Sequence, residues 1–505
     1  MHFRARPILQ SDKETLLASC GAALFWAWVD AALFSPAILP QAVASTYFFA
    51  GAFIISVSVC CATMGLLAFR PNCSLSRVAA STRGMAFCSL LSLPGAALVY
   101  CGGLFGVSAM TLLGSLCNGL VFAIGTLSWG SVYARKGAIT ASVEAPLSFA
   151  LAAFLCIGLE TLLNASALPF AVALLPAGSF AVRIHYRHTY EIPLAPDADT
   201  SQASSLKPED TSDRRPRLMG VASRFGLSSH TIIAFVVFGI AFGFMEAKGM
   251  FVAETLHVDN SAPLLSVRGL VALLLAAASV AFPGNIHAVY RIGMAIMIAG
   301  FMAMPFTLAG TVPTLLSNAI VMIGYTAFDV MCWTILCETS FYRKRLSTSV
   351  VGFGRMLVHS GVAAGVAFGL LVSLFPLDEV HLTAIITSVG YLLIVAVILL
   401  IGDSSGIWTL LRYGTAYDEK NQKEESEGKS DRNGGISFAK FASFYGLSAR
   451  ETEVLELFGV GRSTSFIAQQ LCISENTAKS HVRHIYSKCG IHNKQELLDL
   501  LEEMG

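Results

Sequence analysis

Two cations one helical turn apart, Lys479 and Arg483, stand out in the polar stretch SENTAKSHVRHIYSKCG at residues 474–490. The apolar residues of this stretch recur at helical spacing and predict one buried stripe: Ala478, Val482, Ile485 and Cys489. Lys479, Ser480 and Arg483 then lie on the opposite, exposed face. Cations bind phosphates, and side-chain donors of this kind bind base edges in the DNA major groove. An ordinary solvated face would look the same, and residues 447–505 hold six Lys or Arg against eight Asp or Glu.

A second set of candidate residues is formed by ionisable side chains inside long apolar runs: Asp30, Glu144, Glu246, Arg268, Asp329, Arg355 and His359. Such groups are costly in a membrane and are therefore functional candidates. Asp30, Glu246, Lys248 and Arg268 fall at outer positions of their runs, so they could line one outward-facing cavity with Arg268 as counter-ion. The alternative is purely structural pairing between helices, such as Asp329 with Arg355 or His359. The indoles of Trp26, Trp28 and Trp333 would supply aromatic walls.

The elements that carry the second set are membrane-spanning helices. The 505-residue chain is 54% hydrophobic and only 13% charged, with a mean hydropathy of +0.64, which is too apolar for a soluble protein. A spanning helix needs about 20 apolar residues. Twelve runs satisfy this: Leu16–Phe34, Thr46–Phe69, Met85–Phe105, Met110–Tyr133, Ile139–Leu159, Leu163–Val182, Ile232–Met250, Pro263–Phe282, Ala288–Leu308, Leu315–Cys337, Val350–Phe375 and Leu382–Ile401.

The charges of the short loops predict the orientation of these spans. Lys and Arg concentrate in alternate loops, and the loops between them are nearly free of both apart from Lys248. Positive loops face the cytoplasm, so we expect both termini there and a multi-pass protein of the bacterial inner membrane. The twelve cysteines are scattered without a C-x-x-C pair, which argues against a disulfide framework and a zinc site.

The predicted domain organisation follows from changes in composition. We expect a first six-helix membrane half at 1–186, a cytoplasmic linker at 187–229, a second six-helix half at 230–402, a flexible tether at 403–435 and a small domain at 436–505. The linker and the tether are polar and rich in charge, which is typical of unstructured segments. Six plus six spans around a long central loop resemble the major facilitator superfamily, although the family's charged loop motif after span two is missing.

The small domain is predicted to hold four helices. Ser448 and Glu451 form a capping box at the start of the first, and Gly459 or Gly461 ends it. A short helix after Ser463 and a tight turn lead to the helix that carries Lys479 and Arg483. A fourth helix from about Asn493 carries three leucines: Leu497, Leu498 and Leu501. The fold class is therefore all-α, a twelve-helix membrane bundle followed by a four-helix domain.

The stretch LSARETEVLELFGVGRSTSFIAQQLCISENTAKSHVRHIYSKCGI resembles the LuxR-type (NarL/FixJ-like) helix-turn-helix. The pattern is met at Leu447, Arg450, Glu451, Glu453, Val454, Leu455, Gly461, Ile467, Ala468, Leu471, Ile473, Ser474, Thr477, Lys479, His481, Ile485 and Lys488. The departures are Phe466, Ala478 and Cys489. The resemblance implies that Lys479, Ser480 and Arg483 contact bases and nearby phosphates, and that Thr477 lies near a phosphate. It also implies binding of double-stranded DNA as a homodimer through the last helix.

Two functions remain open on these observations. The first is a one-component transcription regulator whose membrane part senses an unknown small molecule or the state of the lipid bilayer. The second is a secondary transporter with a regulatory DNA-binding tail. The sequence has no nucleotide-binding loop, metal-ligand cluster or kinase motif, so we expect no enzyme activity, no metal and no cofactor.

Overall fold

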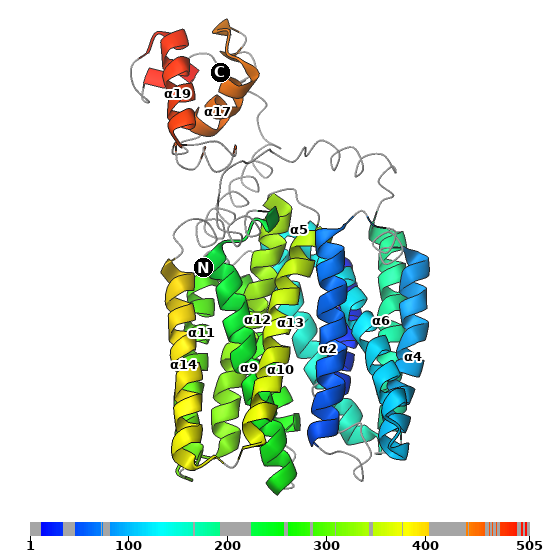
Figure 1. The fold of residues 1–505 in the computed structure, drawn as a ribbon. Helices are drawn as coiled ribbons and strands as arrows, with labels where there is room; N and C mark the ends of the chain where they lie inside the picture. The colour runs from blue at the N-terminus through cyan, green and yellow to red at the C-terminus, as the bar shows by residue number, and fades with distance from the viewer. Residues whose placement is uncertain are drawn as a thin grey trace, which may run out of the picture. The chain divides into compact units, whose positions relative to one another are not determined.

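The computed structural model of the chain divides into two compact units, 1–417 and 418–505, which are considered separately (Figure 1). It describes residues 12–33, 46–71, 73, 81–164, 167–191, 224–256, 261–282, 286–308, 310–342, 347–375, 377–402, 441–442, 444–459, 464, 467, 471, 475–491, 496–497 and 500–501. Of the predicted linker 187–229 only the two ends lie within these ranges, and the predicted tether 403–435 lies outside them.

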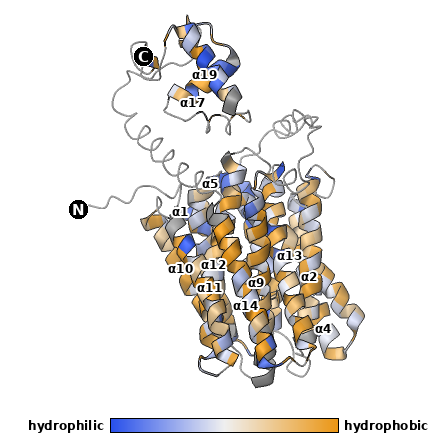
Figure 2. Cartoon of the chain, turned by 60° about the vertical axis from the view of Figure 1, so that its left-hand side comes forward, coloured by the Kyte–Doolittle hydropathy of each residue, from blue (hydrophilic) through white to orange (hydrophobic). Residues whose placement is uncertain are grey.

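The first unit is a bundle of long helices: α1 (Asp12–Leu33), α2 (Thr46–Phe69), α4 (Thr82–Phe105), α5 (Ser108–Leu162), α6 (Leu168–Tyr190), α9 (Ser229–Leu256), α10 (Ser261–Ala281), α11 (Ile286–Leu308), α12 (Thr314–Tyr342), α13 (Ser347–Ser373) and α14 (Glu379–Gly402). They contain twelve segments long and apolar enough to cross a membrane, so the predicted count is confirmed. Large apolar side chains such as Phe170, Val380 and Tyr391 remain exposed, as lipid contact requires. Figure 2 shows that hydrophobic residues predominate along these helices.

Spans four and five are joined without a separate loop, because Arg135 and Lys136 belong to α5; the sequence did not indicate this. Both spans belong to α5, and the helical path is interrupted only at Gly137, whose φ of 81° and ψ of −179° lie outside the helical region. A φ this positive is readily available to glycine and strained for other residues. Gly137 therefore makes the reversal between two spans that would otherwise form one 55-residue helix.

Helices that precede the predicted linker pack against helices that follow it, so the two predicted halves are in contact. Helix α2 packs on α13, and α5 packs on both α10 and α12. Within the second half, α9 and α13 approach most closely at glycines: a Cβ atom at Gly243 or at Gly365 would lie 2.1 Å from a backbone carbonyl of the other helix. Small residues allow this contact, which van der Waals packing stabilises in lipid. The most enclosed helix is α12, which carries Asp329 and Trp333.

The second unit is a small helical domain with its own apolar core. Its longest described helices are α17 (Ala449–Gly459) and α19 (Glu475–Cys489). The core consists of Phe441, Val454, Leu455, Phe458, Ile467, Ala478, Val482, Ile485, Leu497 and Leu501. The predicted short helix after Ser463 is described only at Thr464, Ile467 and Leu471. The all-α fold class is thus confirmed for both units.

Candidate nucleic-acid interface and intramembrane charge network

Helix α19 separates an apolar face from a polar face, as its sequence predicts. Ala478 and Ile485 are fully buried, and Val482 is nearly so. Thr477, Lys479 and Arg483 are exposed, whereas Ser480 is half-buried at the edge of the polar face. The helix ends before Gly490, which has a left-handed φ of 68°. The polar face therefore points away from the core, while the apolar face fixes the helix on it.

The start of α17 is closed by the predicted capping box. The backbone N–H of Ser448 donates to Glu451 Oε2 at 2.8 Å, and the backbone N–H of Glu451 donates to Ser448 Oγ at 3.3 Å. Glu451 also accepts a 2.6 Å hydrogen bond from Lys488 Nζ near the end of α19. Burial would raise the pKa of Glu451, but the bonds from Lys488 and Ser448 outweigh it and lower the pKa to about 2. Glu451 therefore has two roles: it caps the start of α17, and it holds α19 against α17 through Lys488.

Arg450 supports the turn that precedes α19. Its Nη2 donates to the backbone carbonyl of Leu471 at 2.5 Å, and its Nη1 lies 2.5 Å from Glu453 Oε2. Leu471 is four residues before Glu475, the first residue of α19. Arg450 is thereby engaged within the domain, and its contacts fix the position from which the candidate DNA-contacting helix starts.

The last segment of the domain contributes to its core. Leu497 and Leu501 are buried among the core side chains, and the side chain of Leu498 lies outside the described residues. A contact between two copies through this segment would therefore have to use a face that does not carry Leu497 and Leu501. The sequence pattern alone did not separate these two roles of the leucines.

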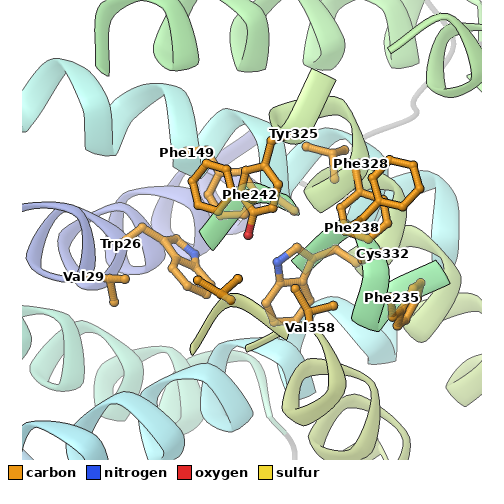
Figure 3. Close-up of a cluster of buried hydrophobic side chains, with 14 of the residues drawn as sticks. Trp26, Val29, Phe149, Phe235, Phe238, Phe242, Tyr325, Phe328, Cys332 and Val358 are labelled. Atoms are coloured by element: carbon orange, nitrogen blue, oxygen red, sulfur yellow. The ribbon is translucent and has the colours of Figure 1, made fainter. Parts of the chain in front are cut away.

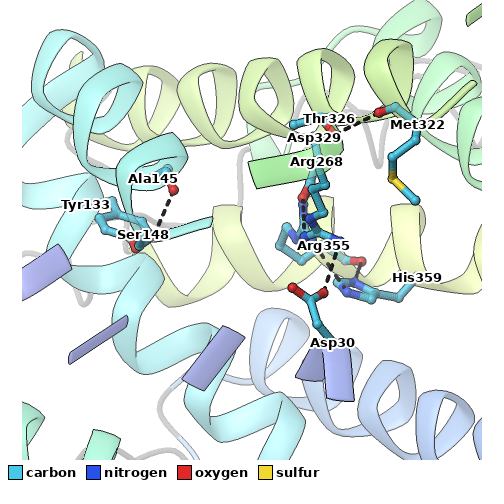
Figure 4. Close-up of polar contacts among 10 residues, drawn as sticks. All are labelled: Asp30, Tyr133, Ala145, Ser148, Arg268, Met322, Thr326, Asp329, Arg355 and His359. Atoms are coloured by element: carbon cyan, nitrogen blue, oxygen red, sulfur yellow. Dashed lines mark hydrogen bonds and ion pairs between the residues drawn. The ribbon is translucent and has the colours of Figure 1, made fainter. Parts of the chain in front are cut away.

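Five of the predicted intramembrane residues meet in one network (Figure 4). Arg268 Nη1 of α10 lies 3.0 Å from Asp30 Oδ1 of α1, and Arg268 Nη2 lies 4.0 Å from Asp329 Oδ2 of α12. Arg355 of α13 pairs with the other oxygen of Asp329. His359 Nδ1 is 2.7 Å from the carbonyl of Arg355, and His359 Nε2 faces Arg355 Nη2 at 3.5 Å. The expected pairing of Arg268 with Asp30 and the alternative pairing of Asp329 with Arg355 are both present, in one continuous network.

Aromatic rings contact both cations of this network, and Trp26 and Phe149 belong to the buried apolar cluster drawn in Figure 3. The guanidinium of Arg355 lies 4.7 Å from the ring centroid of Trp333, and that of Arg268 lies 5.3 Å from Phe149. Trp26 makes edge contacts with both rings, at 5.3 Å to Phe149 and 5.8 Å to Trp333. Each cation is therefore held by a carboxylate and by an aromatic face, which strengthens its retention in a medium of low dielectric constant. Trp28 lies elsewhere, against Phe25.

Asp30 is the least satisfied member of the network. Its side chain is only 2% exposed, yet beyond its ion pair with Arg268 its carboxylate accepts no hydrogen bond from the described residues. Glu246 is half-buried in α9 and interacts electrostatically with Asp30 and Arg268. The side chain of Lys248 lies outside the described set. No group of His, Cys, Asp and Glu with metal-binding geometry occurs among the described residues.

Glu144 belongs to a separate cluster near the break at Gly137. Lys136 Nζ lies 2.7 Å from Glu144 and 3.1 Å from Glu14, and Glu14 accepts a 2.7 Å hydrogen bond from Tyr186. Nearby, Arg183 pairs with Glu191 at 2.7 Å. The predicted sixth span, Leu163–Val182, ends just before Arg183, but the Arg183 side chain is only 2% exposed. Acids and bases recur at matching depths in α1, α5 and α6, and this pattern in the sequence could have indicated the cluster.

Comparison with known proteins bears first on the C-terminal domain. Residues 446–501 match the model of GerE, bacterial regulatory proteins of the luxR family. The spore germination protein GerE of Bacillus subtilis is 36% identical over 59 residues, which are 12% of this chain and 80% of that protein. The Fimbriae Z protein of Salmonella typhimurium (strain LT2) is 43% identical over 53 residues, 10% of this chain and 25% of that protein. The transcriptional activator protein ExaE of Pseudomonas putida is 39% identical over 64 residues, which cover 13% of this chain and 30% of that protein.

The membrane part resembles solved transporters in fold. The human organic anion transporter MFSD10 (TETRAN) aligns with a TM-score of 0.50 at 15% identity, over 77% of this chain and 98% of that chain. A bacterial homologue of the iron transporter ferroportin in the outward-facing state aligns with a TM-score of 0.51 at 14% identity, over 78% of this chain and 99% of that chain. At such identities the likeness concerns the fold and not the cargo. The membrane part therefore shares its fold with these solved transporters, and the chain belongs, through residues 446–501, to the luxR family of bacterial regulatory proteins.

Proposed function

We propose that this protein is a one-component transcription regulator embedded in the bacterial inner membrane, with both termini in the cytoplasm. The observation that carries the proposal is the combination, in one chain, of twelve membrane-spanning segments and a luxR-family domain with an exposed basic helix face. In this reading the membrane part senses a small molecule or a membrane state, and two copies of the C-terminal domain bind DNA together. No enzymatic step is proposed.

The DNA contacts are assigned to the polar face of α19. Lys479 and Arg483 would contact phosphates and base edges, Ser480 a base edge, and Thr477 a phosphate near the helix start. This assignment is supported by the burial of the opposite face, which leaves Thr477, Lys479 and Arg483 exposed and Ser480 at the edge of the polar face. A short helix held on a small core by its apolar stripe is the element that the major groove accommodates.

The ligand site is assigned to the network of Asp30, Arg268, Asp329, Arg355 and His359, with Glu246 beside it. Its support is physical: buried charges are costly in lipid, and the carboxylate of Asp30 is not fully satisfied by the described residues. The network also joins α1 of the first half to α10, α12 and α13 of the second. A ligand that changed these pairs would alter the relation of the halves, provided that it preferred one arrangement.

A secondary transporter with a regulatory tail is the second candidate, and the transporter fold of the membrane part favours it. Uptake of a labelled solute into proteoliposomes that requires Asp30 or Asp329 would support this candidate. Absence of uptake together with ligand-dependent DNA binding would support the regulator.

The regulator is tested by selecting DNA from a random oligonucleotide pool with the full-length protein in lipid nanodiscs. We expect the wild type to enrich an inverted repeat and the Lys479→Ala/Arg483→Ala double variant to enrich none. Arg70→Ala/Arg135→Ala, which removes two exposed cations from the membrane part, serves as the charge-matched control and should select the same repeat. Enrichment that survives the double variant would refute the assignment of α19, and no enrichment at low salt would refute DNA reading.

A further inference from the structure

Residues 224–228, at the end of the predicted linker and just before α9, form a turn that contacts the bundle. Arg224 and Phe225 precede Gly226, whose φ of 74° turns the backbone. Ser228 Oγ then accepts the backbone N–H of Thr231 at 3.1 Å, which caps the start of α9. The side chain of Phe225 is almost entirely buried although it lies just outside a spanning helix.

The Phe225 ring lies between two helices of different halves. It stacks on Phe353 near the start of α13, with centroids 4.1 Å apart and planes 10° from parallel. It meets Phe69, the last residue of α2, edge-on at 5.1 Å. Phe69 and Phe353 also touch, at 5.8 Å and 86°. Aromatic pairs in these geometries attract each other beyond simple burial, so the three rings bind three segments of the chain together.

Arg224 adds a polar contact to the same place. Its Nη2 donates to the backbone carbonyl of Phe69 at 2.9 Å. The guanidinium also lies 5.3 Å from the ring of Phe69 and 5.8 Å from that of Phe225. The last carbonyls of a helix lack intrahelical partners and carry the negative end of its dipole. A cation from the end of the predicted linker therefore caps the end of α2, a helix of the first half.

We propose that Arg224 and Phe225 form a latch that holds the end of α2 against α13, so that the two halves separate at this end only when Phe225 leaves the two rings. The loop charges predict this end to be cytoplasmic. Beyond the latch, α2 and α13 stay in contact at Cys61, whose Sγ lies 3.7 Å from the carbonyl of Met356. The proposal concerns the membrane part alone and does not depend on DNA binding.

Cys61 provides a native reporter for the latch. It lies two helical turns before Phe69 in α2, and its thiol faces α13. The thiol of Cys61 is partly buried, and it reacts with a maleimide faster when more water and reagent reach it. The full-length protein in lipid nanodiscs is treated with N-ethylmaleimide, and the modification rate of each cysteine is measured by mass spectrometry. Cys117 in α5, outside the α2–α13 contact, reports on general loosening.

We expect Phe225→Ala and Phe353→Ala each to raise the modification rate of Cys61 about tenfold, which corresponds to about 1.4 kcal/mol. Arg224→Gln should give a smaller rise in the same direction, and because it leaves the apolar core intact, it keeps the test valid if an alanine variant does not fold. Phe180→Ala, which empties an equally buried site in α6, is the matched control. An unchanged Cys61 rate in the three latch variants, or an equal rise at Cys61 in Phe180→Ala, would overturn the latch.

Discussion

The contact between Glu451 and Lys488 allows a quantitative test of how α19 is held on its domain. Glu451→Gln keeps an oxygen that can accept the Ser448 N–H, so the cap is retained. The change removes only the negative charge that faces Lys488 Nζ at 2.6 Å. Any loss of stability then reports the charge pair that joins α17 to α19.

The magnitude follows from the pKa of Glu451. A carboxyl whose pKa falls from 4.5 to about 2 on folding stabilises the folded state by at most about 3 kcal/mol, since each pH unit is worth about 1.4 kcal/mol. The Lys488 side chain is 38% exposed, so solvent screening reduces this figure, and we expect about 1–2 kcal/mol. The folded pKa is the lower one, so this stability is present in full above pH 4.5 and is lost as the pH falls towards 2.

Urea unfolding of a fragment of residues 436–505, followed by circular dichroism, measures this contribution. The match covers 80% of the GerE protein, so a protein little larger than this domain exists on its own. At pH 7 Glu451→Gln should be less stable than the wild type by about 1–2 kcal/mol, and the difference should shrink between pH 4.5 and pH 2.5. Glu453→Gln, which breaks the partly exposed pair with Arg450, should cost less than about 1 kcal/mol. Equal stability of wild type and Glu451→Gln at pH 7 would refute the role given to this pair.

Three other perturbations test further parts of the structure. Gly137→Ala should lower the free energy of unfolding in detergent by about 1–2 kcal/mol, because alanine is strained at a φ of 81°; a neutral result in a thermal melt would argue against the left-handed turn. Lys136→Met should cost about 3 kcal/mol by leaving Glu144 and Glu14 without their cation, and adding Glu144→Gln should restore part of the melting temperature; the same melting temperature in single and double variants would contradict this pairing. Lys479→Ala should reduce the slope of log K against log salt for DNA binding by about one, whereas an unchanged slope in a fluorescence titration would remove Lys479 from the phosphate contacts.

Features set by neighbouring residues could be predicted from the sequence. The twelve spans follow from hydropathy over windows of about 20 residues, and the buried face of α19 follows from the spacing of Ala478, Val482 and Ile485. The capping box of Ser448 and Glu451 is likewise a contact three residues apart. In each case the residues that interact are close in the chain, so periodicity and local hydrogen bonding determine the outcome.

Contacts between distant residues could be anticipated only where depth in the membrane restricts the choice. Asp30 and Arg268 were expected to meet because both occupy outer positions of their spans. The bond of Glu451 to Lys488, 37 residues apart, and the stacking of Phe225 on Phe353 have no such restriction. They depend on the orientation of helices around each other, which a single sequence does not specify. The assignment of the polar face of α19 to DNA, and of the charge network to a ligand, stays a prediction.

Arg268 interacts with two carboxylates, and this affects how fast the contact between α1 and α10 can open. Arg268 of the second half holds Asp30 of the first half at 3.0 Å while it also interacts with Asp329. If α1 moves away from α10, the guanidinium of Arg268 separates from the carboxylate of Asp30. Both side chains are still buried at that point, so water does not yet hydrate them. Separating charges at low dielectric constant is costly, so this separation is a barrier and the exchange between arrangements is slow. The contact between Asp30 and Arg268 is therefore expected to outlast brief fluctuations of the helices that carry it.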